Sequence, residues 1–114
     1  MLVLLSVCAL ACHYPALAPM AHDVTVTILP PPPSCERIAS IRGRAGTEWP
    51  PAENLREPHH TYALTTYAMN DLRNRAAAVG ANYVQRSEPT LSWGTRATAE
   101  YAGVAYLCAK GEGE

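Results

Sequence analysis

The sequence predicts an α+β fold in which a small, mostly antiparallel sheet of about four strands carries one helix on one face. Three observations predict it: an alternating segment at Val24–Ile28, a helical apolar repeat at Tyr67–Val79 and a largely apolar final segment at Thr98–Cys108. The order strand, strand, helix, strand, strand is typical of one sheet covered by a single helix. A chain of 114 residues is long enough for one such domain and too short for two.

Four segments have the composition of strands. Val24–Ile28 alternates apolar residues with threonine and ends before the four prolines at 30–33, which cannot donate hydrogen bonds to a neighbouring strand. Cys35–Arg44 is the second predicted strand, and Tyr83–Gln85 is the third and shortest. In Thr98–Cys108 both alternating sets of residues are mostly apolar, which is typical of a central strand.

The clearest helical pattern covers Tyr67–Val79. Its apolar residues recur three or four positions apart and form one stripe that contains Met69, Leu72, Ala76 and Val79. Thr65 or Thr66 can cap the beginning of this helix, and Gly80 can adopt the left-handed conformation that closes it. The preceding stretch, Thr47–Thr61, contains three prolines and is predicted as a loop.

The first twelve residues are uncharged and apolar except for Ser6, and this run is about half as long as a membrane-spanning helix. Such a length is typical of the core of a signal peptide. The run ends in Ala9-Leu10-Ala11-Cys12, which resembles the lipobox of bacterial lipoproteins, where the signal peptidase cuts before a lipid-modified cysteine. We therefore predict a signal peptide at residues 1–11 and lipidation of Cys12. The alternative is an ordinary signal peptide cleaved near Ala16-Leu17-Ala18, without a lipid.

The rest of the chain divides into a lipidated tether at residues 12–22, a single α+β domain at residues 23–110 and a frayed tail at residues 111–114. The acyl chains on Cys12 are the predicted contact with a membrane. In lipoproteins the usual signal for retention at the inner membrane is Asp in the second mature position, where this chain has His13. The lipobox therefore predicts a location in the bacterial cell envelope, at the inner leaflet of the outer membrane and facing the periplasm. No Lys or Arg precedes the apolar run, which leaves open a translation start further upstream.

The chain contains four cysteines: Cys8, Cys12, Cys35 and Cys108. If Cys8 leaves with the signal peptide and Cys12 carries lipid, Cys35 and Cys108 remain for a disulfide, which an oxidising compartment favours. This bond would close a loop of 73 residues. The chain-entropy model assigns roughly 4 kcal/mol of stabilisation to a loop of that length. The alternative is two separate buried thiols that behave as small hydrophobic groups.

Composition and motifs argue against several classes of function. A formal net charge of −1 argues against binding to nucleic acid, which needs a basic surface. The sequence has no glycine-rich phosphate loop and no GxSxG motif, so we expect no catalytic site, no cofactor and no metal centre. We predict a non-catalytic domain that acts by contact with an unidentified envelope protein. The alternative is a periplasmic module that binds a small ligand or a metal through His22, His59, His60 and Cys35, although these residues lack the spacing of a metal site.

Residues 70–82, NDLRNRAAAVGAN, resemble the helix-and-turn motif of small bacterial envelope lipoproteins typified by YjeI, a family of domains of unknown function. The ending Gly103–Cys108 and the signal-peptide region resemble the same proteins. The resemblance covers roughly Val24–Cys108 and implies a fold and a cellular location without an activity. The motif residues in this chain are Asn70, Asp71, Leu72, Arg73, Asn74, Gly80 and Asn82.

The outer-membrane lipoprotein RcsF resembles this chain more distantly, with a similar arrangement of helix and sheet. It carries two disulfides whereas the predicted mature chain can form one, so no signalling role is carried over to this protein. We expect the motif to be structural. Asn82, for example, tolerates left-handed geometry and can hydrogen-bond within its own turn.

Overall fold

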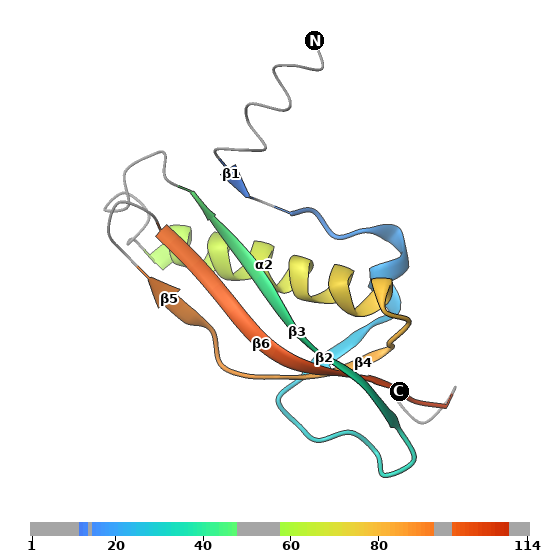
Figure 1. The fold of residues 1–114 in the computed structure, drawn as a ribbon. Helices are drawn as coiled ribbons and strands as arrows, with labels where there is room; N and C mark the ends of the chain where they lie inside the picture. The colour runs from blue at the N-terminus through green and yellow to red at the C-terminus, as the bar shows by residue number, and fades with distance from the viewer. Residues whose placement is uncertain (1–11, 14, 48–57, 93–96, 110–114) are drawn as a thin grey trace.

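The computed structural model describes residues 12–13, 15–47, 58–92 and 97–109. It consists of one long helix on one face of a six-stranded sheet, which confirms the predicted α+β class (Figure 1). In chain order the elements are β1 (Cys12–His13), the 3-10 helix η1 (Pro19–Asp23), β2 (Thr25–Thr27), β3 (Glu36–Thr47), α2 (Pro58–Ala78), β4 (Tyr83–Arg86), β5 (Thr90–Ser92) and β6 (Ala97–Leu107).

The sheet has the strand order β1-β3-β6-β4-β2, and β5 also pairs with β6. The pairs β1–β3, β3–β6, β4–β6 and β5–β6 are antiparallel, whereas β2 and β4 run parallel. The predicted central position of the last strand is confirmed, since β6 pairs with β3 on one side and with β4 and β5 on the other. All four predicted strands are present, and the short strands β1 and β5 add to them.

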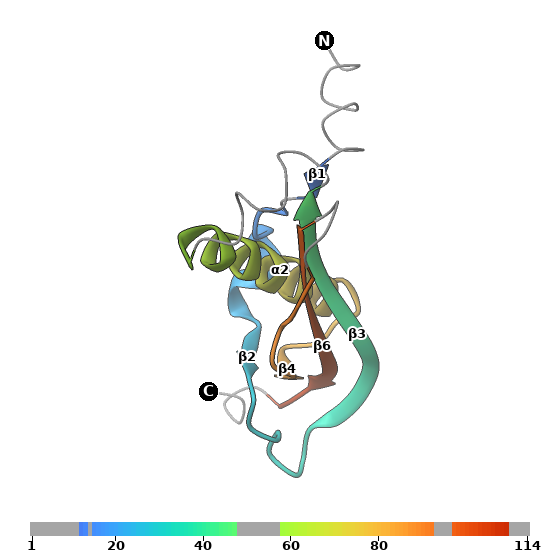
Figure 2. The ribbon, with the colours of Figure 1, turned by 90° about the vertical axis from the view of Figure 1, so that its left-hand side faces the viewer.

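Helix α2 lies against β3 and β6, and the two layers are seen edge-on in Figure 2. Small residues on both strands allow a close approach: Ala45, Ala97, Ala99 and Ala105 are all buried. At Gly43 the backbones nearly touch, because a Cβ there would collide with the carbonyl oxygen of Ala68 and with the backbone nitrogen of Leu72. The largest fully buried side chains, Leu64, Leu72 and Val84, fill the remaining space between helix and sheet.

The helix begins earlier than the sequence pattern predicts. It starts at Pro58, so the end of the predicted loop Thr47–Thr61 is helical, and Thr65 and Thr66 lie inside the helix instead of capping it. Proline is favourable in the first helical turn because its missing N–H needs no partner there. The apolar repeat does not extend to this first turn, and the prediction therefore began too late. The predicted end is confirmed, since Gly80 follows the helix with φ of +83°.

A disulfide joins Cys35 to Cys108, as predicted. Cys35 precedes β3 and Cys108 follows β6, and the neighbouring residues Glu36 and Leu107 are partners in the β3–β6 register. The bond therefore closes the end of the longest strand pair in the sheet. Cys108 was expected to be the last strand residue, but β6 ends one residue earlier, at Leu107.

Loss of the disulfide should lower the stability of the domain by about 4 kcal/mol, because the unfolded chain regains the entropy of an open 73-residue loop. For a domain of this size, that corresponds to a decrease in Tm of about 20 °C. Thermal unfolding of the oxidised protein, compared with the Cys35→Ser/Cys108→Ser variant, measures the difference. Equal Tm values, or non-reducing peptide mapping without a Cys35–Cys108 peptide, would contradict the prediction.

Gly43→Ala should destabilise the domain by about 3 kcal/mol, because the new Cβ meets helix backbone that can move only if α2 leaves the sheet. Gly80→Ala is the matched control. Nothing lies within 4 Å of its Cβ position, so only the strain of a positive φ remains, about 1–2 kcal/mol. Denaturant unfolding of both variants measures the two values. A smaller loss for Gly43→Ala than for Gly80→Ala would show that the close helix–strand contact is not rigid.

Candidate functional site

The predicted lipidation residue, Cys12, lies in β1 at one end of the sheet. Its backbone pairs with Thr47, and His13 pairs with Gly46, so the chain joins the folded domain directly at this cysteine. The predicted signal peptide at residues 1–11 and the predicted tail at residues 111–114 lie outside the described residues.

The segment after β1, which the sequence analysis assigns to a tether, lies along the outer side of α2 (Figure 1). Two motif asparagines hold its backbone. The amide of Asn74 donates to the carbonyl oxygen of Ala16 and accepts from the N–H of Ala18, both at 2.8 Å. The amide of Asn70 donates to the carbonyl oxygen of Pro15 at 3.2 Å. Because Ala21 in η1 is also fully buried, residues 15–23 form part of the domain.

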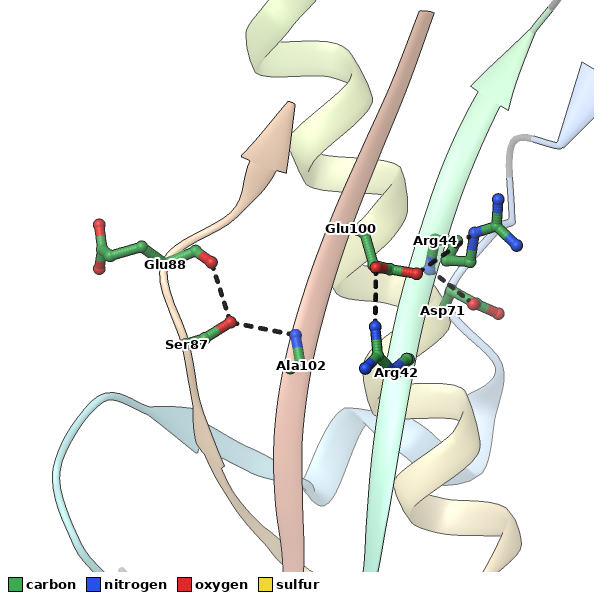
Figure 3. A network of polar contacts seen from close by, with 7 residues as sticks. All are labelled: Arg42, Arg44, Asp71, Ser87, Glu88, Glu100 and Ala102. Atoms are coloured by element: carbon green, nitrogen blue, oxygen red, sulfur yellow. Dashed lines mark hydrogen bonds and ion pairs between the residues drawn. The ribbon is translucent and has the colours of Figure 1, made fainter. Parts of the chain in front are cut away.

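Asp71, the next motif residue, reaches from the helix to the outer edge of β3 (Figure 3). Its carboxylate oxygen Oδ2 accepts the backbone N–H of Arg44 at 2.8 Å and the Nε–H of Arg75 at 3.0 Å. The side chain is largely buried, and the two donors satisfy its charge. The motif residue Leu72 is fully buried in the core between α2 and the sheet.

Asn82, the last residue of the motif, hydrogen-bonds to the backbone of the disulfide residue Cys108. Asn82 donates from Nδ2 to the carbonyl oxygen of Cys108 at 2.9 Å, and its Oδ1 accepts the N–H of Cys108 at 2.8 Å. It therefore pairs with a residue 26 positions away, and its φ is not positive, so the expected turn role was wrong. Arg73 is half-buried, and its Nε has no hydrogen-bond partner among the described residues.

The face of the sheet opposite the helix carries a charged network (Figure 3). Since Gly43 faces the helix, its neighbours Arg42 and Arg44 point to the opposite face. There Glu100 of β6 accepts from Arg42 at 3.0 Å and lies 3.4 Å from Arg44. All three side chains contact solvent, so these ion pairs contribute little stability.

A broad, open cavity of about 920 Å³ lies beside this network. The cavity is lined by residues 40–42 of β3 and residues 102–104 of β6. Its lining also includes residues 85 and 86 of β4, the next residue, Ser87, and Arg75, Ala78 and Val79 at the end of α2. We call it the arginine cavity, because its described lining contains Arg42, Arg75 and Arg86 but neither Asp nor Glu.

Each arginine of the arginine cavity has one acidic neighbour outside the lining. Arg42 contacts Glu100 and Arg75 contacts Asp71, each at 3.0 Å, whereas Arg86 lies 3.7 Å from Glu88. A guanidinium has five N–H donors, so a single carboxylate contact leaves donors for a second anion. Arg42 and Arg75 keep 69% and 55% of their side-chain surface exposed, and they are the arginines that a ligand in solution can reach.

Arg86 is held differently from the other two arginines. Its guanidinium carbon lies 5.4 Å from the centre of the Tyr101 ring, in a cation–π contact. Burial raises the pKa of Tyr101, although the Arg86 charge and a hydrogen bond with Thr65 act in the opposite direction. Tyr101 therefore stays neutral at physiological pH, and its ring positions Arg86 at the rim of the arginine cavity.

The structure describes only some of the residues of the metal-binding alternative. Among the residues that the structure describes, no group of three or more His, Cys, Asp or Glu side chains could hold a metal ion. His22 is exposed in η1, Cys35 is in the disulfide, and the side chains of His59 and His60 lie outside the described residues.

Sequence reasoning missed the arginine cavity because its lining comes from four elements. One signal was available: Arg42 and Arg44 are two positions apart in a predicted strand, and alternation places them on one face. No pattern in the sequence predicts that Arg75 and Arg86 line the same cavity.

Asn74→Ala should release the segment at residues 15–18, because it removes two hydrogen bonds and leaves the Ala18 N–H without its acceptor. We expect a loss of about 1–2 kcal/mol in unfolding free energy and faster amide exchange at residues 16–18. Ala78→Ser, an exposed change on the same helix, is the control and should cost less than about 0.5 kcal/mol. Unchanged exchange in Asn74→Ala would show that packing of Ala21 alone holds the segment.

A family model for a domain of unknown function (DUF4156) matches residues 16–108 of this chain. The matched region contains the whole sheet except β1, the helix, both disulfide cysteines and the asparagine-containing motif. Searches of curated proteins and of solved structures find no significant match. The match extends over most of the chain, and the protein therefore belongs to the DUF4156 family.

Proposed function

We propose that this chain is a lipid-anchored protein of the bacterial cell envelope that acts by contact with another envelope protein. Residues 1–11 serve as a signal peptide, Cys12 carries the lipid, and the domain faces the periplasm from the inner leaflet of the outer membrane. The support is the lipobox-like sequence 9–12, the disulfide between Cys35 and Cys108, and the resemblance of residues 70–82 to the lipoproteins typified by YjeI. No helix among the described residues is long and apolar enough to cross a membrane.

The observation that carries the proposal is the direct connection between Cys12 and the folded domain. The residue is paired with β3, and residues 15–18 are hydrogen-bonded to Asn70 and Asn74 on α2. A lipid on Cys12 would therefore hold the domain against the bilayer in a restricted orientation, without a long flexible spacer. Each buried CH₂ of the acyl chains contributes about 0.8 kcal/mol to this attachment.

The opposite end of the sheet would then point away from the membrane. Strand β3 has 12 residues and extends about 35 Å from the Cys12 pairing to Glu36. At that end Ile28 and Leu29 expose 55% and 62% of their surface, although Tyr83 and Gln85 hydrogen-bond the backbone of residues 28–30. Exposed apolar side chains on a fixed backbone are typical of contact surfaces between proteins.

The second candidate function is a periplasmic module for a small ligand, and the arginine cavity is the observation that favours it. A cavity of about 920 Å³ is within the size range of small-molecule sites. Its arginines would select an anion. However, the cavity is open and Arg42 and Arg75 are more than half exposed, so a small anion would be incompletely enclosed.

Lipidation is tested by metabolic labelling with palmitate in a bacterial host. The wild-type chain should be labelled, and the inhibitor of lipoprotein signal peptidase, globomycin, should cause the precursor to accumulate. Cys12→Ala should lose the label because the thioether has no sulfur to form on. Cys8→Ala is the matched control and should be labelled normally.

Persistent labelling of Cys12→Ala, or a wild-type chain without label, would overturn the lipid anchor. The contact function is tested separately, by crosslinking the tagged protein in cells and identifying its partners. Recovery of the protein without any crosslinked partner, while Cys12 is labelled, would leave the anchor in place and contradict the contact function.

A further inference from the structure

One side of the sheet ends in a long strand that is only partly covered. Strand β3 pairs with β6 along its inner side, and on its outer side β1 is the one described strand that pairs with it, at Gly46 and Thr47. Within the described residues, no strand lies beside the remainder, residues 36–45 (Figure 1). We call the outward-facing backbone groups of Ser40 and Arg42 the free edge of β3.

The hydrogen-bonding pattern defines which groups point outward. In β6 the carbonyl oxygens of Ala102 and Tyr106 accept from Ser87 and Asn82 on the β4 side, so the alternate residues Gly103 and Ala105 bond to β3. Their partners in the register are Ile41 and Ala39, and the same alternation continues along β3, which leaves Ser40, Arg42 and Arg44 facing outward. The Arg44 N–H confirms this direction, because it bonds to Asp71 on the outer side. No hydrogen bond within the described residues occupies the N–H groups of Ser40 and Arg42.

The arginine cavity lies along the same stretch of strand. Its lining includes residues 40–42 of β3 and, from the end of α2, Arg75, Ala78 and Val79. A polypeptide that adds to the free edge of β3 would lie about 4.8 Å from this strand. One set of its side chains would lie on the face of Arg42, and the other set would lie beside Ile41 and the end of the helix.

The charge around the free edge of β3 selects the occupant. Arg37, Arg42 and Arg44 come from the strand and Arg75 from the adjacent helix. The nearby carboxylates are fewer and already have partners: Asp71 accepts from two donors, and Glu100 is shared by Arg42 and Arg44. A second copy of this chain would place the same row of arginines opposite its own, which is destabilising. Basic residues on an edge strand prevent such self-pairing in many proteins. An acidic segment, by contrast, would meet a complementary charge.

We propose that the free edge of β3 binds an extended, acidic segment of a partner protein by strand addition. This rests on the proposed contact function and specifies the partner: a segment that alternates Asp or Glu with small apolar residues. Its backbone pairs with Ser40 and Arg42. Its carboxylates lie on the face of Arg42, and its apolar side chains contact Ile41, Ala78 and Val79 on the helix side, where Arg75 adds positive charge. Backbone pairing provides affinity, and the alternating side chains provide specificity.

The test uses the purified full chain and a fluorescent eight-residue peptide in which Glu alternates with Val. Binding should be measurable at low ionic strength and should weaken as salt is added, because the arginines are exposed. A peptide with Lys in place of Glu should bind at least tenfold more weakly. Equal binding of the two peptides would overturn the acidic preference.

Variants at Ser40 separate strand addition from simple charge attraction. Ser40→Pro removes an N–H that points outward, so it breaks no bond to β6, and proline is tolerated on edge strands. Ser40→Ala is the matched control, since both variants lose the hydroxyl that accepts from Arg37. Ser40→Pro should bind the Glu–Val peptide at least tenfold more weakly than the wild type, and Ser40→Ala within about threefold. Equal affinity of the two variants would overturn the proposal.

A second measurement does not depend on how well a variant folds. Methyl groups are placed on the backbone nitrogens either of all the Glu residues or of all the Val residues of the peptide. Only one of these two sets points toward β3 in a paired strand, so one methylated peptide should lose binding and the other should keep it. If both methylated peptides bind as tightly as the unmodified peptide, only charge holds it and the proposal is wrong.

In cells, a photoreactive amino acid at position 42 or at position 28 distinguishes failure of this inference from failure of the contact function. An adduct at position 42 that Ser40→Pro abolishes supports strand addition. Adducts only at position 28 would place the partner at the exposed residues Ile28 and Leu29, at the end of the sheet away from Cys12. That result overturns the inference and supports the contact function. Adducts at neither position would contradict both. A stable dimer in sedimentation that Ser40→Pro dissociates would identify a second copy, not an acidic segment, as the occupant.

Discussion

The fold depends on the contact between the backbone of α2 and the backbone of β3 at Gly43. Because no side chain separates them, the helix lies closer to the sheet than side-chain packing would allow. This approach brings Asp71 close enough to the sheet edge to accept the N–H of Arg44. On the outer side of the same helix, Asn70 and Asn74 hold residues 15–18. The motif around residues 70–74 therefore joins three layers: the N-terminal segment, the helix and the sheet.

The two ends of the sheet are secured in different ways. At one end β1 pairs with the end of β3, which ties the chain at Cys12 to the longest strand. At the other end the disulfide joins the residues flanking β3 and β6, and Asn82 adds two hydrogen bonds to the backbone of Cys108. Between these two ends, the described part of the chain places no further strand beside β3, and the carboxylate of Asp71 accepts the outward N–H of Arg44. The surface proposed for partner binding is thus the part of the sheet that no strand among the described residues covers.

The charges on this surface explain why an incomplete edge need not cause aggregation. Rows of arginine repel a second copy, and the bulge between Arg37 and Ala39 interrupts the regular edge. The arginine cavity extends this basic surface from β3 to the end of α2. A chain with a net charge of −1 can therefore present a local basic site, because net charge does not describe how charges are distributed.

Local patterns in the sequence determined the class of the fold, the four main strands, the end of the helix at Gly80 and the pairing of the two cysteines. These features depend on neighbouring residues, or on which cysteines would remain if the predicted signal peptide and lipid took up Cys8 and Cys12. The tertiary structure alone decided the early start of α2 at Pro58, the strands β1 and β5, the partner of Asn82 and the arginine cavity. Apart from the helix start, each of these features depends on residues that are distant in the chain. Asn82 bonds to a residue 26 positions away, and Cys12 in β1 pairs with Thr47. Periodicity predicts which face of an element is apolar, but not which other element comes to lie beside it.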